Sequence, residues 1–495
     1  MSTVHPISLY NTLSRSVETV TPVDGSQTIR MYSCGPTVYN VAHIGNMRAF
    51  VAADVLQRVL RTVGGYEVRW VMNITDIDDK TIRDSSETSD CWLPAMGSRA
   101  GDAHGDLRTF TAYWMQEFLH DIQTLGIRQD HLAALPRATD YIQPMQQLVV
   151  DIFNAGYAYV SQGSVYFNVG AYAQQHAYGR LYTIDREHFR EGVRIDADEY
   201  DRESVSDFVL WKAQKDGEPA WDLHIDGQVL PGRPGWHLEC SAMSHELLSP
   251  FPIDIHTGGV DLRFPHHEDE LAQCCAGYHV PDQSHFWVHN EFLEVDGRKM
   301  SKSLGNYYTL RDLLDKGLDP LDIRFALLSA HYRTVLNFTF EGVRAAAAAR
   351  RRVQEYIWDL VDRTDGYEVV DADAPNPLQE VFQELANDVH TPKALAALHT
   401  FINVHPVEEM DEHEAARVLY AFGLLNSVVA VWTAQPRPEI EIPDDVLDLA
   451  DARWEARLAK NWAEADRLRD ALVALGWHMK DGKDGYDILP LEPGT

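Results

Sequence analysis

Apolar residues change their spacing along the first part of the chain, and the pattern predicts two strands with a helix between them. Residues 28–34, TIRMYSC, form a short apolar run typical of a strand. Over residues 52–63 apolar side chains recur on one helical face, and Gly64–Gly65 ends the predicted helix. Residues 67–74, EVRWVMNI, are mostly apolar, as a buried parallel strand should be. This order indicates a doubly wound parallel sheet, whose ligands bind at the carboxyl ends of its strands.

The pattern changes further along the chain and predicts a division into three domains. Residues 1–335 are expected to form an α/β domain with a Rossmann-like doubly wound parallel sheet. Short strand-like pieces and turns at about 157–235 predict a connective insertion within it. Helical periodicity dominates residues 336–436 and predicts an α-helical bundle. Residues 437–495 contain a helical pair and a candidate hairpin, and are expected to form a small C-terminal domain.

The charge balance restricts how this chain can bind a nucleic acid. Its 43 Lys and Arg residues against 75 Asp and Glu residues give a formal net charge of −32. An acidic protein does not attract RNA through its average field, so RNA binding requires local basic patches. The stretch 344–352, RAAAAARRR, is one candidate, with a solvated helix face as the alternative. A second candidate is the C-terminal tail, with Arg453, Arg457, Lys460, Arg467 and Arg469.

Cysteine usage and hydropathy indicate the compartment. The five cysteines are few and odd in number, which argues against a disulfide framework and fits a reducing environment. No apolar run approaches the length of a membrane span, and residues 1–20 lack a secretory apolar region. We therefore expect a cytoplasmic protein without membrane association, while an organellar form stays open.

Several residues with metal-binding side chains occupy predicted strand ends and helix starts. Pro265 suits the first position of a helix, so His266 and Glu270 would stack on one face at i and i+4. Taken alone, such a pair is more often part of a solvated helix face. Cys34 ends the first predicted strand and Cys240 lies just before a predicted helix. Two thiolates, one imidazole and one carboxylate would suit Zn²⁺, and the thiolates disfavour Mg²⁺.

Other polar residues gather at the predicted carboxyl edge of the sheet. In the loop before the first helix, Gly45 lets the backbone approach a nucleotide, and His43 can donate to phosphate oxygens. The alternative is a histidine that caps the helix. Residues 73–80, NITDIDDK, carry three aspartates that either hold a substrate amine or form a helix cap with an acidic first turn.

The stretch 299–303, KMSKS, has the composition of a phosphate-binding loop. Lys299 and Lys302 flank a small turn, and Gly305 follows. Lysine is a compact charge on a long stem, which can follow phosphate oxygens as charge moves during a reaction. By itself, a solvated basic turn is the more frequent explanation of such a stretch.

Several motifs taken together resemble those of a known protein family, whereas each motif alone is too short to indicate one. HIGN at 43–46 and KMSKS at 299–303, in that order on a doubly wound sheet, resemble the paired signature of class I aminoacyl-tRNA synthetases. Five longer stretches closely resemble the cysteinyl-tRNA synthetase family: CGPTVYNVAHIGN, NITDIDDK, GRPGWHLECSAMS, HTGGVDLRFPHHEDELAQ and VDGRKMSKSLGN. The likeness continues more weakly to the C-terminus.

The resemblance implies a reaction and a set of site residues. L-cysteine would be activated with ATP and Mg²⁺ to cysteinyl-adenylate and then transferred to the 3′-terminal adenosine of tRNA(Cys), by an enzyme expected to be a monomer. One Zn²⁺ per chain would select the substrate thiol, and the bundle and tail would bind the anticodon. The implied metal ligands are Cys34, Cys240, His266 and Glu270, and the implied amino-acid pocket is Thr75, Trp236 and His237. The implied ATP-site residues are His43, Gly45, Asn46, Gly259, Asp261, Lys299 and Lys302.

Asn46 departs from the family pattern, which often has histidine there, although an amide can still donate. Two other functions stay open from the sequence. One is a cysteine ligase that shares the catalytic core but joins cysteine to an amino sugar, a type that usually lacks the C-terminal extension. The other is a non-catalytic RNA- or nucleotide-binding relative, which the presence of His43, Lys302 and the four candidate ligands opposes.

Overall fold

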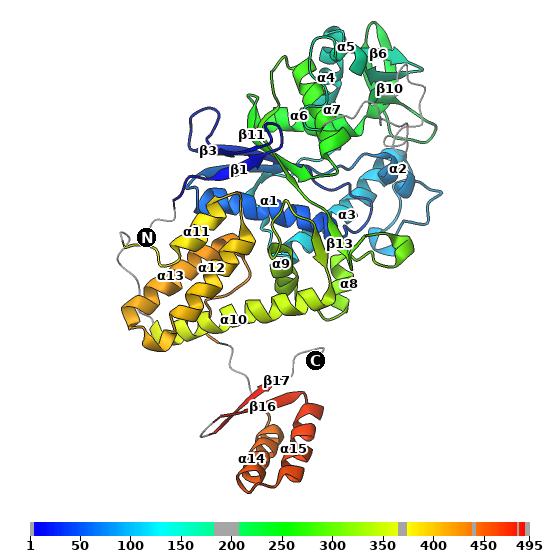
Figure 1. Ribbon diagram of the computed structural model, residues 1–495. Coiled ribbons are helices and arrows are strands. Elements are labelled where there is room, and N and C mark those ends of the chain that lie inside the picture. Colours follow the sequence, from blue (N-terminus) through cyan, green and yellow to red (C-terminus); the bar gives the residue numbers. More distant parts are fainter. Residues whose placement is uncertain (1–3, 183–206, 365–373, 438–441, 483–484, 491–495) are drawn as a thin grey trace. The chain divides into compact units, whose positions relative to one another are not determined.

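The computed structural model describes residues 4–182, 207–364, 374–437, 442–482 and 485–490 (Figure 1). The chain divides into two compact units: Met1–Leu313 with Asp319–Ala434, and Leu314–Leu318 with Gln435–Thr495. The first unit contains the central sheet and the predicted site residues. Across the described ranges, no helix is long and apolar enough to cross a membrane.

A five-stranded parallel sheet, in the order β12-β11-β3-β4-β5, is the centre of the first unit. The chain runs outwards from β3 to β4 and β5, and later from β11 to β12 on the other side, so the order reverses between β3 and β11. Ligands of such sheets bind at this reversal, beyond the carboxyl ends of the strands. The predicted α/β class with a doubly wound parallel sheet is confirmed. The strands are β3 (Thr28–Ser33), β4 (Glu67–Met72), β5 (Leu132–Ala134), β11 (Ile253–Gly259) and β12 (Ser284–Asn290).

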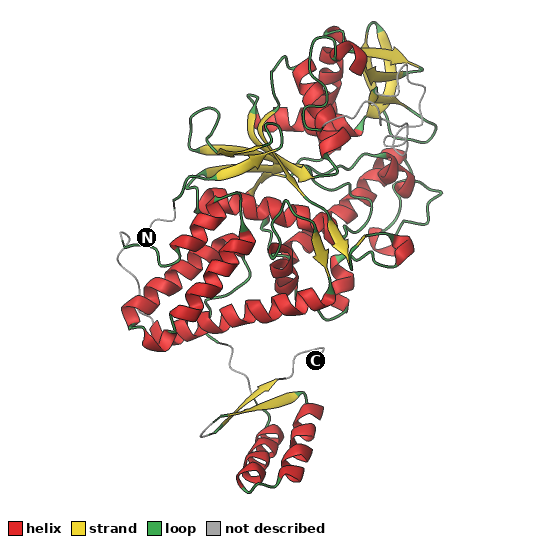
Figure 2. Ribbon diagram, in the orientation of Figure 1, coloured by secondary structure: helices red, strands yellow, loops and turns green. Residues whose placement is uncertain are grey.

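Helices cover the sheet on both faces (Figure 2). Helix α1 (Ile44–Thr62) contacts β4 and β11, and α6 (Trp236–Leu248) contacts β3. The apolar face that predicted α1 is buried, as at Val55, Leu56 and Val59. Strand β3 is buried at all but its first residue, which is why its sequence reads as a nearly continuous apolar run.

An antiparallel sheet, in the order β6-β7-β8-β10-β9, is inserted between α4 (Ile142–Asn154) and α6. Strand β10 ends at Pro234, and Gly235 leads directly into α6. The insertion therefore fixes the start of the helix that carries Cys240. Its strands are β6 (Ala158–Ser161), β7 (Ser164–Phe167), β8 (Phe208–Ala213), β9 (Trp221–Ile225) and β10 (Gln228–Pro234).

A short hairpin and a group of helices follow the parallel sheet. Strand β13 (Leu293–Val295) pairs antiparallel with β14 (Arg298–Lys299) and parallel with β15 (Leu336–Phe338). Helix α13 contacts α1, so the helical bundle packs into the same unit as the sheet. A domain boundary at residue 335 therefore stays a prediction. The bundle helices are α10 (Phe340–Thr364), α11 (Gln379–Ala386), α12 (Thr391–Val404) and α13 (Glu412–Val429).

The polar stretch 84–106 runs from the end of α2 to the start of α3, with one 3₁₀ turn at Pro94–Met96. The remaining elements before the C-terminal unit are β1 (Ser8–Asn11), β2 (Ser16–Thr19), α2 (Asp79–Ser85), α3 (Ala103–Thr124), α5 (Val169–Tyr172), α7 (Glu268–Gly277), α8 (Leu310–Asp315) and α9 (Pro320–Leu328).

The second unit is a helical pair and a hairpin around a small core of Val446, Ala450, Leu472 and Met479. Its arginines are neutralised locally: Arg453 and Arg457 both pair with Asp481, and Arg467 pairs with Glu464. The tail is therefore less basic than its arginine content suggests. Its elements are α14 (Asp444–Leu458), α15 (Trp462–Ala474), β16 (Trp477–Asp481) and β17 (Tyr486–Pro490).

Candidate active site

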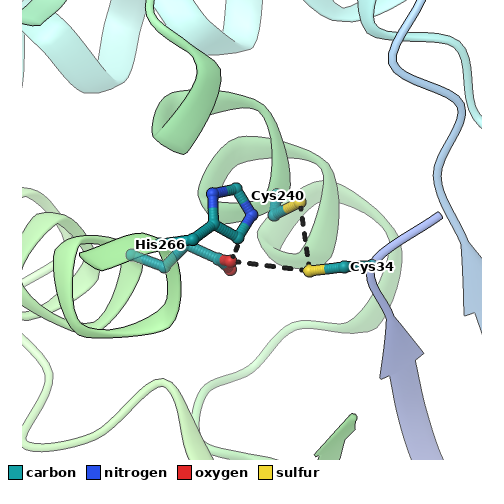
Figure 3. Close-up of side chains that lie close together, drawn as sticks. Cys34, Cys240 and His266 are labelled. Atoms are coloured by element: carbon teal, nitrogen blue, oxygen red, sulfur yellow. Dashed lines mark hydrogen bonds and ion pairs between the residues drawn. The ribbon is translucent and has the colours of Figure 1, made fainter. Parts of the chain in front are cut away.

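Four side chains with metal-binding groups converge beyond the carboxyl end of β3 (Figure 3). Cys34 follows β3, and Cys240 lies in α6. His266 lies in the π-helical turn Arg263–His267, and Glu270 lies in the first turn of α7, which follows it. The Sγ atoms of Cys34 and Cys240 are 3.7 Å apart, and Cys34 Sγ is 3.7 Å from Glu270 Oε1. Nε2 of His266 lies 3.0 Å from the same carboxylate oxygen. The structure thus brings together the four residues that the sequence analysis proposed as ligands.

The spacing of these atoms fits a tetrahedral metal site. With Zn–S bonds of about 2.3 Å, two thiolates at a tetrahedral angle lie about 3.8 Å apart. A disulfide requires about 2.05 Å between its sulfurs. The 3.7 Å between the two thiols is therefore a chelating distance and not a bond. Two sulfurs, an imidazole nitrogen and a carboxylate oxygen are donors that zinc prefers.

Neighbouring groups shift the pKa values of the side chains in this cluster. Burial opposes ionisation of Cys240, but its hydrogen bonds with Cys34 and His266 lower its pKa to about 6. Burial likewise opposes ionisation of Glu270, but His256 and His266 hold the pKa of that carboxyl well below its usual range. Burial raises the pKa of the Cys34 thiol, which therefore keeps its proton. Because metals bind the deprotonated donors, metal binding would release protons from this cluster.

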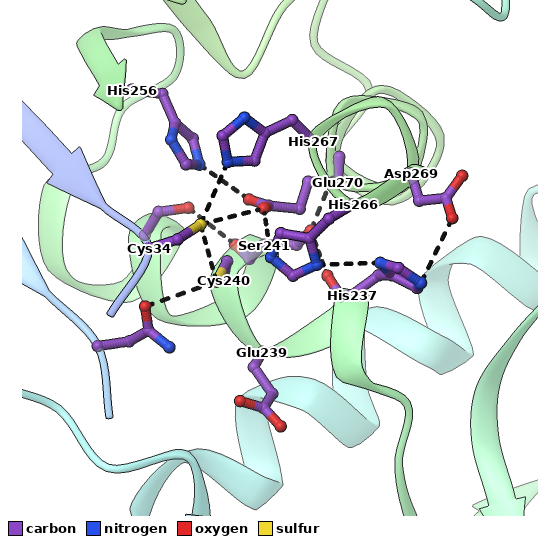
Figure 4. A network of polar contacts seen from close by, with 12 residues as sticks. Cys34, His237, Glu239, Cys240, Ser241, His256, His266, His267, Asp269 and Glu270 are labelled. Carbon is purple, nitrogen blue, oxygen red and sulfur yellow. Dashed lines mark hydrogen bonds and ion pairs between the residues drawn. The ribbon is translucent and has the colours of Figure 1, made fainter. Parts of the chain in front are cut away.

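A second candidate ligand set shares two members with the first (Figure 4). Cys34 Sγ lies 3.3 Å from His267 Nε2, and Glu270 Oε2 lies 2.9 Å from His256 Nε2. The other ring nitrogen of His267, Nδ1, forms a hydrogen bond with His289 Nε2 at 2.8 Å. This second set would include one thiol only, so we favour the first set for zinc. His256 lies in β11, His267 lies just before α7, and His289 lies in β12. No spacing in the sequence indicates that these histidines meet.

Helix α1 begins at the same edge of the sheet with a histidine cap. Asn46 N donates to His43 Nδ1 at 3.1 Å, and His43 N donates to Asn46 Oδ1 at 3.3 Å. Burial lowers the pKa of His43, which favours the neutral ring. Since Nδ1 accepts a hydrogen bond, the ring proton lies on Nε2. The structure therefore shows the capping role, and the cap orients Nε2–H as a donor.

Side chains lie close to two glycines of the predicted ATP site. A Cβ at Gly45 would lie 2.7 Å from Met300 Cε and 3.0 Å from the ring of His43. The two signature segments therefore touch at Gly45. A Cβ at Gly259 would lie 2.4 Å from Asp261 Oδ1. Glycine at these positions keeps the edge of the sheet open.

Lys299 and Ser303 of the KMSKS loop are exposed, and Met300 and Ser301 are half-buried. Asn306 Oδ1 accepts from Ser301 N at 2.9 Å, and Asn306 Nδ2 donates to Lys299 O at 3.2 Å. Lys299 lies in β14 and is exposed. The side chain of Lys302 lies outside the described part of the chain.

The residues proposed for the amino-acid pocket adjoin the cluster. Trp236 is 37% exposed and stacks on the ring of His266, with 4.3 Å between centroids. His237 Nδ1 lies 3.0 Å from His266 Nδ1. Thr75 is buried and donates to Glu239 Oε2 at 2.6 Å. Trp236 and His237 thus surround one candidate ligand, whereas α6 holds Thr75 through a carboxylate that the sequence analysis missed.

The aspartates of the NITDIDDK segment have structural partners. Asp76 accepts from Arg137 Nε at 2.9 Å, and Asp78 caps α2. Asp79 accepts from Lys212 Nζ at 2.8 Å, and this contact joins α2 to the inserted sheet. Of the two alternatives from the sequence, the structure shows helix capping.

The chain matches one family model and several known proteins. Residues 20–348 match the family described as tRNA synthetases class I (C) catalytic domain. The cysteine–tRNA ligase of Chlamydia trachomatis serovar A is 40% identical over 98% of this chain and 99% of its own length. That of Opitutus terrae is 41% identical, over 98% of this chain and 99% of its own length.

The chain belongs to the cysteine–tRNA ligase family. Solved class I synthetases share its fold. A Mycobacterium tuberculosis methionyl-tRNA synthetase bound by methionyl-adenylate aligns with a TM-score of 0.54 at 16% identity, over 81% of this chain and 92% of that chain. A leucyl-tRNA synthetase of Agrobacterium radiobacter K84 aligns with a TM-score of 0.56 at 11% identity, over 83% and 85%. These likenesses show that this chain has the class I synthetase fold.

Proposed function

We propose that this chain is a cysteine–tRNA ligase that acts in two steps. The carboxylate of L-cysteine attacks the α-phosphorus of ATP, and cysteinyl-adenylate and pyrophosphate form. A ribose hydroxyl of the terminal adenosine of tRNA(Cys) then attacks the acyl carbon, and AMP leaves. The observation that carries the proposal is the group Cys34, Cys240, His266 and Glu270 at the sheet edge where α1 begins. Membership of the family supports the choice of substrates.

We assign the selection of cysteine to one zinc ion held by these four ligands. A bound Zn²⁺ supplies a soft Lewis acid that a thiolate ligates well and a serine hydroxyl does not. Shape alone discriminates poorly between cysteine and serine, because the two are nearly isosteric. Trp236, stacked on the ligand His266, would close the pocket beside the substrate side chain. The hydroxyl of Thr75 donates to Glu239, so its oxygen lone pair would accept from the substrate ammonium.

The residues at the start of α1 and in the KMSKS loop would position ATP with Mg²⁺. His43 Nε2–H would donate to phosphate oxygens, and the positive N-terminal end of the α1 dipole would favour their negative charge. Lys299 and Lys302 would neutralise the charge that develops on the leaving pyrophosphate. Gly45, Gly259 and Asp261 would lie along the adenosine. These groups align the reactants and stabilise charge, and the reaction requires no protein nucleophile.

The test is cysteine-dependent ATP–pyrophosphate exchange, followed by charging of tRNA and by metal analysis. We expect exchange with cysteine and not with serine, charging of tRNA(Cys), and about one zinc per chain. Exchange without tRNA charging would favour the amino-sugar ligase instead. A lack of exchange in zinc-loaded protein would overturn the proposed activity.

A further inference from the structure

Arg48, one turn after the His43 cap, is a buried arginine of α1 with an unusual set of partners. It is 3% exposed. Its NH1 donates to Glu291 O at 2.8 Å and to Phe292 O, and its NH2 donates to His331 O at 3.2 Å and to Thr334 O. All four acceptors are backbone carbonyls from two separate segments.

The first of these segments is the base of the hairpin that carries Lys299. Glu291 and Phe292 directly precede β13, which pairs with β14. The guanidinium is planar and rigid, so four carbonyls bound to it keep a defined geometry. Arg48 therefore ties the base of the KMSKS hairpin to the helix that begins at His43.

The second segment, residues 331–334, is held in turn by Asp388 of the bundle. Asp388 is 5% exposed and lies between α11 and α12. Its carboxylate accepts from Tyr332 Oη at 2.6 Å, Arg333 Nε at 2.8 Å and Tyr10 N at 2.9 Å. Its backbone carbonyl lies 2.8 Å from His331 Nε2.

The backbone around Asp388 is strained. Asp388 has φ of 58° and Val389 has φ of 51°. Left-handed backbone is uncommon for residues other than glycine and is an outlier for a β-branched residue such as valine. Strain of this kind persists where the surrounding contacts over-determine it, and such sites are often functional. Here the contacts that hold the turn are those that hold residues 331–334.

We propose that Arg48 and Asp388 are positioning residues that together set the KMSKS hairpin against α1 and link the helical bundle to the ATP site. We call Arg48, Asp388 and the segments 291–292 and 331–334 the carbonyl clamp. The clamp touches no substrate in this scheme. It acts through Lys299 and Lys302, and it rests on the proposed function. A displacement of the α11–α12 turn would pass through residues 331–334 to Arg48 and the hairpin base.

The first test is Arg48→Lys with Arg30→Lys as a matched control. Lysine keeps the charge but cannot span four carbonyls. Arg30 is also buried, at 8% exposed, and donates to the carbonyls of Leu248, Pro250 and Pro252. Those carbonyls lie before β11, at the opposite edge of the sheet. We expect Arg48→Lys to lower kcat of pyrophosphate exchange about 10- to 100-fold, with KM for cysteine changed by less than about twofold.

Arg30→Lys should lower thermal stability without this effect on kcat. Equal kcat losses in the two variants would show a general loss of stability and would overturn the proposal. An unchanged kcat in Arg48→Lys would overturn it as well.

The second test is the pair Arg48→Lys and Asp388→Asn in a double-mutant cycle. Asparagine keeps the shape of the Asp388 side chain but loses the negative charge that pairs with Arg333. If the two residues form one clamp, the loss in kcat of the double variant should be close to that of Arg48→Lys alone. If the fold losses in kcat of the two single variants multiply in the double variant, the two residues act independently. That result would overturn the proposed connection between Asp388 and Arg48.

Hydrogen exchange of residues 291–299 separates this proposal from the activity itself. Arg48→Lys and Asp388→Asn should raise the amide exchange of β13 and β14 by roughly tenfold, and Arg30→Lys should leave it unchanged. This readout requires no turnover. A wild-type protein without cysteine-dependent exchange would refute the proposed function, whereas unchanged hairpin protection in both variants would refute the clamp.

Discussion

The two sides of the candidate site are built in opposite ways. On the amino-acid side, Cys240, His266 and Glu270 are buried, and each has partners in the cluster. On the nucleotide side, Lys299 and Ser303 of the KMSKS loop are exposed, and the side chain of Asn306 bonds to the loop backbone. The first region is buried and internally hydrogen-bonded, and the second is attached at its base and partly exposed at its tip.

This difference follows from what each side must recognise. Discrimination of a thiol from a hydroxyl depends on donor atoms at fixed distances, so a rigid and desolvated cluster suits it. Stabilisation of a leaving pyrophosphate requires positive charge close to its oxygens as they become more negative during the reaction. A loop that can adjust its position suits this task. Mutations on the two sides should therefore differ in what they change: metal and cysteine affinity on one side, the rate of adenylate formation on the other.

The largest loss should come from Cys240→Ser. A hydroxyl is a poor zinc ligand at this position, so the protein should lose its zinc. Exchange should fall by about 1,000-fold or more, well beyond the roughly 10- to 100-fold typical of losing an outer partner. Metal analysis and KM for cysteine measure the effect, and Cys91→Ser, at an exposed cysteine, is the control. Zinc content equal to that of the control would show that the ligand set is wrong.

The next largest effect should come from Lys302→Ala in the loop. We expect kcat of adenylate formation to fall about 100- to 1,000-fold, because the lysine meets charge that develops in the transition state. Zinc content and KM for cysteine should stay near wild-type values. Lys393→Ala, at an exposed lysine of α12, is the matched control. If Lys302→Ala changed kcat and KM for cysteine equally, the loop would not act on adenylate formation alone, and the proposed difference between the nucleotide side and the amino-acid side would be wrong.

The sequence predicts the sheet from local apolar patterns, and it predicts the four clustered side chains from long motifs that resemble a known family. The sequences of β3 and β4 are mostly apolar, and Cys34 and Cys240 occur within long motifs. Contacts between distant segments are harder to foresee. His256 lies in a strand and is separated from Glu270 by a turn, yet its Nε2 is 2.9 Å from that carboxylate.

The left-handed turn at Asp388 was equally hidden from the sequence. Its residues are Asp388 and Val389, and valine is typical of extended backbone rather than of a left-handed turn. The turn is held by Tyr10, Tyr332 and Arg333, which are distant in the sequence. Tertiary contacts, rather than local preference, therefore determine its conformation.

A smaller effect should decide between the two ligand sets. His256→Ala removes a partner of Glu270 Oε2 in the first set but a ligand in the second. With the first set, zinc should still bind at one per chain, with affinity weakened about 10- to 100-fold. Gln283→Ala is the control, because Gln283 donates to the same oxygen at 3.1 Å and belongs to neither set. Complete loss of zinc in His256→Ala would favour the second set.

The smallest effect should come from Asn306→Ala, which tests whether the loop is adjustable. The variant loses the bonds to Ser301 N and Lys299 O, so the open loop should become more mobile and kcat should fall only about 3- to 10-fold. Asn337→Ala is the matched control, because Asn337 accepts from Gly297 N at 2.7 Å in the turn of the same hairpin. It should leave kcat within about twofold of wild type. Single-turnover adenylate formation measures both variants. A loss in Asn306→Ala as large as that of Lys302→Ala would mean that the loop, like the cysteine cluster, acts as a rigid part of the site.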